Sequence, residues 1–319
     1  MDELLQVQNL KKYFPTKHGM LHAVDDVTFS IGRGRTMGVV GESGCGKSTL
    51  GRVLTHLETS TEGQFIFDGK DVTNVKRKAL KEYRENAQII FQDPYSSLNP
   101  RYTVEETIQE PLILTHRYSK AQLREKTTEM MDLVGIAPRL RMSYPHELDG
   151  GRRQRVVIAR ALALDPKFVV CDEPVSSLDV SIQAQILNLL LKLQEEKKFT
   201  YMFITHDLSV VRYISNDICV MYLGQLVESA SSEALFANPL HPYTKALLSA
   251  LPTVDIHHKM NRIVLKGEIT SPVNPPEGCR FAARCNYACE ACHKKQQLQE
   301  VEPGHFVSCC RVKELNNLT

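Results

Sequence analysis

The sequence has almost no excess of charge of either sign, with 39 Lys and Arg residues against 37 Asp and Glu residues and a formal net charge of +2. This balance excludes the overall basic footprint of a dedicated nucleic-acid binder, so we expect no nucleic-acid partner. No apolar run approaches the roughly 18 residues that a transmembrane helix requires. The acidic start, Met1-Asp2-Glu3, also lacks the basic and then apolar order of a secretion signal. We therefore expect a cytosolic chain.

Internal repeats and low-complexity segments are absent as well. The 319 residues are about twice a typical domain of roughly 150 residues, which predicts two domains, or one large and one small. Apolar residues make up 42% of the sequence, which is enough for an ordinary globular core.

The pattern of apolar residues predicts an α/β fold. Alternation over residues 5–10 and 23–29 indicates antiparallel strands. Short apolar runs and helical spacings then follow one another, which favours a parallel sheet. The expected strands are 36–40, 64–67, 87–91, 167–171 and 200–204, and the expected helices are 153–164 and 182–194.

Two parts of the chain differ in pattern from the rest. Residues 103–142 have a helical pattern, so we expect a helical subdomain, about 96–160, inserted into a domain of residues 1–235. After that boundary, frequent prolines predict a loop-rich tail, residues 236–319.

The segment Gly41-Glu42-Ser43-Gly44-Cys45-Gly46-Lys47-Ser48 matches the phosphate-loop pattern G-x-x-x-x-G-K-[ST], between a predicted strand and a predicted helix. Glycines let backbone N–H groups turn towards phosphate oxygens, and a helix N-terminus adds partial positive charge. Lys47 would neutralise the β- and γ-phosphates, and Ser48 would ligate Mg²⁺. We predict that these residues and Thr49 bind the phosphates of a nucleotide. The alternative is a chance glycine-rich turn.

A second motif places two carboxylates, Asp172 and Glu173, at the end of a buried strand. Such a position beside a phosphate loop suits Asp172 as a Mg²⁺ partner. Glu173 could orient or deprotonate the attacking water, because a carboxylate near metal and phosphate is a fitting general base. The alternative is that the two acids end the strand in a solvated turn.

A third motif, Leu148-Asp149-Gly150-Gly151-Arg152, precedes a basic helix. Over essentially the whole chain, six ordered motifs resemble the nucleotide-binding subunits of ATP-binding-cassette (ABC) transporters: the phosphate loop, Gln92, this Leu-x-Gly-Gly signature, Asp172-Glu173, Ser176-Ser177-Leu178-Asp179 and His206. Segments 91–100 and 238–244 are similar to the peptide/nickel import branch. The resemblance implies an α/β P-loop NTPase core of ABC type, with an antiparallel β subdomain, a helical insertion and a loop-rich, metal-binding C-terminal tail.

The resemblance also implies roles for single residues. Tyr13 lies at the spacing of the aromatic residue that stacks on adenine. Gln92 would sense the γ-phosphate and Mg²⁺, and His206 would contact the γ-phosphate and hold the attacking water. Ser177 and Asp179 belong to the loop that crosses the dimer interface. The implied catalytic set is thus Lys47, Gln92, Glu173 and His206. Plainer alternatives are a half-buried strand-end aromatic for Tyr13, a turn residue for Gln92 and a strand-capping residue for His206.

The signature departs from the family pattern at Asp149, where the family normally has serine. That serine usually donates a hydrogen bond to the γ-phosphate of the ATP held by the opposite subunit, and an ionised carboxylate would repel it. We therefore hypothesise that the chain works beside a second, different ATPase subunit with an intact signature. The alternative is that Asp149 caps its helix, points away from phosphate and costs little.

Six of the nine cysteines crowd the C-terminal tail. In a reducing cytosol such a cluster predicts metal binding before disulfides, and four thiolates suit zinc or an iron–sulfur cluster. The resemblance implies a 4Fe–4S cluster on Cys279, Cys285, Cys292 and Cys309. Cys289 or Cys310 could replace one of these ligands, and zinc or free buried thiols are the alternatives. A structural role is favoured, since a short loop-rich tail has little core.

Together these features predict an ATP- and Mg²⁺-dependent subunit that energises the import of oligopeptides or dipeptides. The implied partners are a second ABC ATPase subunit, two transmembrane permease subunits and, indirectly, an extracytoplasmic substrate-binding protein. The chain would lie peripherally at the cytoplasmic face of the membrane. Nickel or a nickel chelate is the alternative cargo. A soluble ABC ATPase of DNA repair or translation is less favoured, because there is one phosphate loop and no sustained heptad pattern.

Overall fold

The computed structural model describes residues 2–251, 262–267 and 271–318, which form two compact units. The first unit consists of Met1–Thr73 and Phe203–Thr319, and the second of Asn74–Met202. The boundary falls inside β8 (Thr200–Ile204), a predicted strand that is buried along its whole length.

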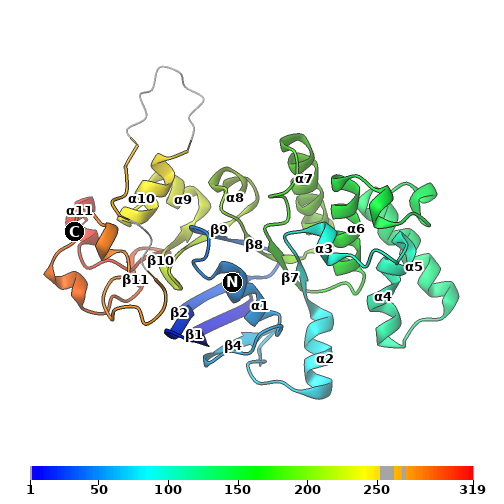
Figure 1. The fold of residues 1–319 in the computed structure, drawn as a ribbon, viewed down its shortest axis with the longest axis horizontal. Helices are drawn as coiled ribbons and strands as arrows, with labels where there is room; N and C mark the ends of the chain where they lie inside the picture. The colour runs from blue at the N-terminus through cyan, green and yellow to red at the C-terminus, as the bar shows by residue number, and fades with distance from the viewer. Residues whose placement is uncertain (1, 252–261, 268–270, 319) are drawn as a thin grey trace. The chain divides into compact units, whose positions relative to one another are not determined.

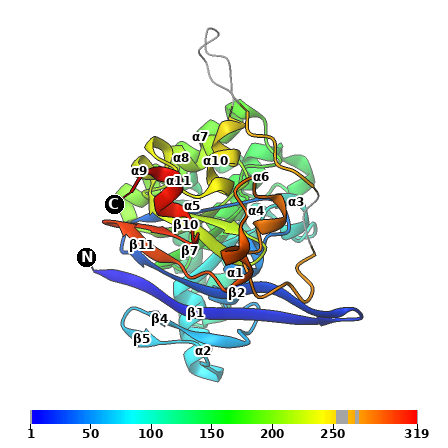
Figure 2. The ribbon, with the colours of Figure 1, turned by 90° about the vertical axis from the view of Figure 1, so that its left-hand side faces the viewer.

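An antiparallel sheet opens the first unit (Figure 1). Its order is β2-β1-β4-β5, and its strands are β1 (Glu3–Thr16), β2 (Gly19–Gly32), β4 (Glu62–Phe67) and β5 (Lys70–Asp71). Figure 2 shows β1 and β2 as a long hairpin, paired from Glu3 opposite Gly32 to Thr16 opposite Gly19. Leu5 and Val7 are buried, as the alternating pattern predicted, and a register shift between Val7 and Leu10 brings Leu10 to the buried side as well.

A second group of strands in the first unit includes β3, the strand that precedes the phosphate loop. β3 (Thr36–Val40) is parallel to β9 (Asp217–Tyr222), and β9 is antiparallel to β10 (Gln225–Ser231). Every residue of β3 is buried, as expected of a strand without polar alternation. The helices α1 (Lys47–Leu54) and α8 (Leu208–Ile214) each follow a buried strand and its loop.

The tail has more regular structure than its prolines predicted. β12 (His305–Val307) pairs with β10 and with β11 (Gln299–Glu302), so the C-terminal residues extend a sheet of the first unit. Helix α9 (Ser232–Ala237) crosses the predicted boundary, and α10 (Pro242–Ser249) and α11 (Val312–Asn316) lie within the tail. Sequence periodicity missed these elements because each is short.

A buried carboxylate organises the tail. Glu228 of β10 is fully buried and accepts hydrogen bonds from the backbone N–H groups of Leu240 (2.7 Å) and His241 (2.9 Å). Its Oε1 also lies 2.7 Å from Nε2 of His305. Burial alone would raise the pKa of Glu228, but these hydrogen bonds outweigh it and hold the pKa below the ordinary value.

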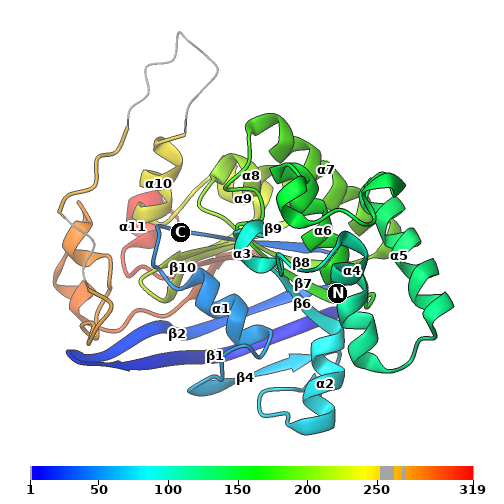
Figure 3. The same ribbon diagram turned by 45° about the vertical axis from the view of Figure 1, so that its right-hand side comes forward.

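The second unit is mainly helical. Besides the first part of β8, it contains β6 (Ala87–Ile90) and β7 (Phe168–Asp172), which are parallel. Figure 3 shows α4, α5 and α6 close together. The helices are α2 (Arg77–Asn86), α3 (Pro94–Ser97), α4 (Val104–Thr115), α5 (Lys120–Val134), α6 (Gly150–Leu162) and α7 (Val180–Lys197).

Local sequence explains where these helices begin. Capping boxes start α4, with Thr103 and Glu106, and α5, with Ser119 and Gln122. The helical pattern predicted over 103–142 is confirmed by α4 and α5, whereas residues 135–142 contain only the 3-10 turn Pro138–Leu140. The predicted helices 153–164 and 182–194 begin earlier than expected, at Gly150 and Val180.

Within the described ranges, we find no helix with both the length and the hydropathy needed to cross a membrane.

Candidate nucleotide site and cysteine cluster

The predicted phosphate loop connects β3 to α1, so its strand–loop–helix context is confirmed. Gly41 and Gly46 have φ of 154° and 104°, which favour glycine. A Cβ on Gly41 would lie 2.2 Å from the carbonyl oxygen of Met221, and one on Gly46 would lie 1.9 Å from that of Ala23. The two glycines therefore allow the loop to pack directly against the backbones of β9 and β2.

Lys47 lies inside this loop. Its Nζ donates hydrogen bonds to the carbonyl oxygens of Gly41 (2.8 Å) and Glu42 (3.0 Å), and the residue is 5% exposed. Lys47 also begins α1, so Ser48 and Thr49 occupy the first helical turn. Ser43 and Gly44 are exposed at the tip of the loop. The arrangement concentrates positive potential where phosphate oxygens would bind.

Tyr13 of β1 belongs to a polar cluster in the same unit. Its ring stacks on His22 with centroids 4.0 Å apart, and its hydroxyl donates to Asp25. Burial, followed by this hydrogen bond to the carboxylate, raises the pKa of Tyr13 above its ordinary value, so the hydroxyl stays a donor at neutral pH. One face of the ring is therefore covered by His22.

In the second unit the structure brings two predicted catalytic residues together. Nε2 of Gln92 donates a hydrogen bond to Oε2 of Glu173 over 2.8 Å. Glu173 follows Asp172, the buried last residue of β7, and has a φ of 48°. A positive φ is uncommon for a residue other than glycine, and here it turns the chain sharply at the end of β7. The hydrogen bond orients the carboxylate that the sequence proposes as the base.

His206 is exposed directly after β8, before the Asp207 cap of α8. The backbone N–H of Thr205 donates to the carbonyl of Val39, which fixes this segment beside the end of β3. His206, Tyr13 and the phosphate loop thus belong to the first unit, whereas Gln92, Asp172 and Glu173 belong to the second.

Asp149 caps helix α6, as its chemistry predicts. Its Oδ1 accepts the backbone N–H of Arg152 over 2.8 Å, and its Oδ2 lies 3.4 Å from Nε of the same arginine. Both side chains are about half exposed. The capping alternative for Asp149 therefore agrees with the geometry, and Arg152 compensates part of the charge.

The two glycines of the signature allow a close approach to the loop before α7 and to the first turn of that helix. A Cβ on Gly150 would lie 3.3 Å from Leu178, and one on Gly151 would lie 2.9 Å from Ile182. Leu148, the first residue of the signature, is buried. Ser177 and Asp179 are exposed, and the neighbouring Val180 is 81% exposed. The predicted interface loop is thus a surface segment held against the signature.

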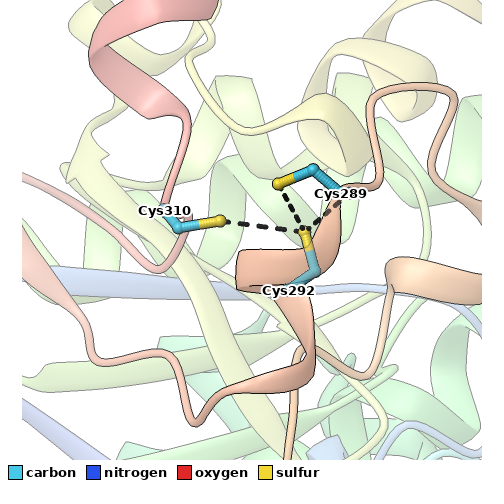
Figure 4. Close-up of side chains that lie close together, drawn as sticks. All are labelled: Cys289, Cys292 and Cys310. Carbon is cyan, nitrogen blue, oxygen red and sulfur yellow. Dashed lines mark hydrogen bonds between the residues drawn. The ribbon is translucent and has the colours of Figure 1, made fainter.

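The cysteines of the tail gather in a different combination from the predicted one. The sulfur atoms of Cys289, Cys292 and Cys310 lie within 4.8 Å of one another, with Cys292 3.9 Å from Cys289 and 3.7 Å from Cys310 (Figure 4). Cys292 alone belongs to both this triplet and the predicted set. A cavity beside it is lined by Cys279, Cys285, Cys292, Cys309 and Cys310, which includes all four predicted ligands.

Protonation of these thiols depends on burial. Burial raises the pKa of Cys279 to about 11 and that of Cys310 to about 12. Both groups are therefore thiols at neutral pH when no cation is bound, and a metal would displace their protons.

Two family models match this chain. The ABC transporter model covers residues 24–176, and the model for the C-terminal region of oligopeptide/dipeptide transporters covers residues 227–292. The oligopeptide transport ATP-binding protein AppF of Bacillus subtilis is 49% identical, with 97% of each chain covered. The chain belongs to the ABC transporter ATPase family.

A second curated relative and a solved structure agree with this family assignment. The dipeptide transport ATP-binding protein DppF of Escherichia coli is 48% identical, over 98% of this chain and 96% of that protein. Among solved structures, the ATP-binding cassette MJ0796 bound to ADP and Pi has a TM-score of 0.66 at 29% identity, covering 72% of this chain and 98% of that one. The predicted ABC-type α/β fold and ATPase activity are thus confirmed.

Sequence reasoning about this ABC ATPase missed Arg280 and Arg284. Arg280 donates to Asp25, and Arg284 donates to Glu42 of the phosphate loop. The available signal was their position between Cys279 and Cys285, where a charged side chain needs a partner if the segment is buried.

Proposed function

We propose that this ABC ATPase energises the import of short peptides across the cytoplasmic membrane. The observation that carries the proposal is the match of residues 227–292 to the C-terminal region of oligopeptide/dipeptide transporters, in the same chain as the ABC match. Relatives named for oligopeptide and dipeptide transport support it. In this proposal residues 1–235 are the ATPase domain, with the helical insertion at about 96–160, and residues 236–319 are the transporter-specific tail.

The proposed chemistry is hydrolysis of the terminal phosphate of ATP. Lys47 neutralises phosphate charge, Glu173 orients or deprotonates the water, and His206 contacts the γ-phosphate. Gln92 supports Glu173 through the 2.8 Å hydrogen bond between them. Tyr13 would stack on adenine with the face that His22 leaves uncovered.

Mg²⁺ would be held by Ser48, Gln92 and Asp172. Hydroxyl, amide and carboxylate oxygens are ligands that suit this hard cation, so the donor set fits. When bound, Mg²⁺ neutralises charge that develops on the phosphates.

We also propose that the chain acts peripherally, through partner subunits, at the cytoplasmic face of the membrane. Those partners are two permease subunits, a second ATPase subunit and, indirectly, a substrate-binding protein. Asp149 supports a different second ATPase, because the partner's ATP would meet a carboxylate where the family has serine. The pairing with Arg152 favours the alternative in which Asp149 caps its helix and weakens the partner's ATP site only slightly.

The tail, we propose further, holds a metal centre of the 4Fe–4S type. The donor chemistry fits, because the cavity is lined by cysteines from three segments of the tail. Cys279, Cys285, Cys292 and Cys309 would hold the cluster, and Cys289 and Cys310 are the competing ligands. Iron and sulfide analysis with visible absorption of Cys309→Ser and Cys310→Ser variants would decide between them: the variant of a true ligand loses the cluster.

ATP-driven uptake into vesicles that contain the complete transporter tests the function. Labelled short peptides and labelled nickel are offered separately, and a Glu173→Gln complex serves as the control. We expect peptide uptake with the unmodified complex and none with the variant. Uptake of nickel alone would mean that the mechanism is right and that the cargo is nickel. Uptake of neither cargo, with intact ATPase activity, would favour a soluble ABC ATPase.

A further inference from the structure

Two arginines of the tail are buried in the unit that carries the phosphate loop. Arg280 and Arg284 are 6% and 8% exposed, and both lie in the segment between Cys279 and Cys285. A buried guanidinium is costly unless it is paired, so its partners indicate what it positions.

Arg284 is paired with the phosphate loop itself. Its Nη1 and Nη2 donate to the two carboxylate oxygens of Glu42, over 2.7 Å and 3.1 Å. Such a two-point contact fixes orientation as well as distance. The backbone N–H of Glu42 in turn donates to the hydroxyl of Tyr243 over 3.0 Å, so this loop residue is held at both its side chain and its backbone.

Arg280 contacts the other side of the same region. It donates to Asp25, which also accepts the hydroxyl of Tyr13, and to the carbonyl oxygen of Leu223. The next residue, Gly224, donates its N–H to the carbonyl of Cys45 in the loop over 2.8 Å. Arg280 therefore supports both the Tyr13 cluster and the backbone against which the loop packs.

Phe281 fixes the two arginines relative to one another. It is 2% exposed and packs against Tyr222 and Tyr243, with ring centroids 5.3 Å and 5.4 Å away. The segment from Arg280 to Arg284 thus enters the protein as one anchored unit whose charged ends reach the nucleotide-binding residues.

We propose that Arg280 and Arg284 are positioning residues for the nucleotide, through which the cysteine-rich tail sets the geometry of the phosphate loop. The inference rests on the nucleotide site proposed above. Arg284 holds Glu42 and neutralises a carboxylate that would otherwise stand unpaired beside the phosphates. Arg280 holds the Tyr13–Asp25 pair and the backbone next to Cys45.

Binding of ADP to the full-length chain, measured by titration calorimetry, tests this proposal without turnover. Arg284→Ala is expected to raise the Kd for ADP by about tenfold, and Arg280→Ala by a similar factor. Arg284→Lys keeps the charge but not the two-point contact, so we expect a smaller rise. If Arg284→Ala does not fold, Arg284→Gln takes its place with the same expectation.

A second change at Glu42 separates positioning from mere folding. In Arg284→Ala the Glu42 carboxylate is left uncompensated, so adding Glu42→Gln should recover the part of the affinity that charge accounts for, while the part that depends on the two-point contact stays lost. A purely structural role for Arg284 would not respond to that change.

The matched control is Lys295→Ala, which removes another contact between the tail and the N-terminal sheet, the 2.7 Å ion pair with Asp26. It should leave the Kd for ADP unchanged. If the arginine variants bind ADP with a Kd within twofold of that of the unmodified chain, the positioning role is wrong but the nucleotide site still stands. Failure of the unmodified chain to bind ADP would overturn the nucleotide assignment with it.

Discussion

The phosphate loop and the cysteine cluster lie in the same unit, yet one is far easier to derive from sequence than the other. The loop is contiguous, and its glycines and Lys47 have their positions dictated by local backbone geometry. The cluster is assembled from segments that meet only after folding, since β11 and β12 separate Cys292 from Cys310 in the sequence. Contiguous motifs encode their own geometry, whereas dispersed ligands depend on the tertiary structure around them.

The pair formed by Gln92 and Glu173 is intermediate in how easily it can be predicted from the sequence. The two residues are distant in sequence, but each follows a strand, and β6 and β7 are parallel neighbours. Their carboxyl ends therefore lie at the same edge, where side chains that follow the strands can meet.

The largest expected effect is on ATP turnover, at Glu173, which lies in one of the contiguous sequence motifs. Glu173→Gln should lower ATP turnover by at least about 100-fold, because glutamine accepts no proton from the attacking water. Nucleotide binding should persist, since the phosphate loop is unchanged. Phosphate release and ADP titration measure the two quantities. Turnover within tenfold of the unmodified enzyme would remove Glu173 from the role of base.

Much of the fold was predictable because its signals are local. The alternation in β1 and β2, the apolar runs of β3, β7 and β8 and the helical spacing of α4 and α5 all gave elements that the structure confirms. The strands β11 and β12 were missed because they are short and depend on pairing with β10. Likewise, no local signal shows that Glu228 is buried and bonded to His305, since their contact joins distant segments.

A substitution at Glu228 tests whether the tail and the phosphate loop unfold together. If they do, the two regions differ in how their sequences encode them but not in how they fold. Glu228→Ala leaves two buried backbone N–H groups and His305 without their acceptor. We expect the free energy of unfolding to fall by about 3–5 kcal/mol, because each buried polar group left without its acceptor costs about 1–3 kcal/mol. Chemical denaturation monitored by both circular dichroism and ADP binding should show one shared transition. Two separate transitions would mean that the tail unfolds independently of the loop.

Acid should weaken the tail through His241. Burial lowers the pKa of this histidine to about 4, against about 6.5 in an unfolded chain. The unfolded state therefore binds the proton first, so stability is complete above about pH 6.5 and is lost as the pH falls towards 4, by up to about 3 kcal/mol. Glu228 contributes to this dependence only at lower pH, because its own pKa is held below the ordinary value.

His241→Asn isolates that contribution. Asparagine keeps an acceptor for the Tyr243 N–H that His241 now caps over 3.1 Å, but it does not titrate. The loss of stability between pH 6.5 and pH 4, measured by denaturation of metal-free protein, should be smaller in the variant. If stability falls equally with pH in the two proteins, the acid sensitivity comes from groups other than His241.

The smallest effect on stability is expected at Asp149, where the motif departs from its family. Serine and asparagine cap helices about as well as aspartate, so Asp149→Ser and Asp149→Asn should change the free energy of unfolding by less than about 0.5 kcal/mol. Activity discriminates further. If the carboxylate repels the ATP of the opposite subunit, both variants should raise ATP turnover by the isolated chain several-fold, because both remove the charge. A rise in Asp149→Ser alone would instead identify the missing hydroxyl donor as the defect. Ordinary transporter rates in the unmodified isolated chain, with no gain in either variant, would favour the capping role and remove the reason to require a different second ATPase.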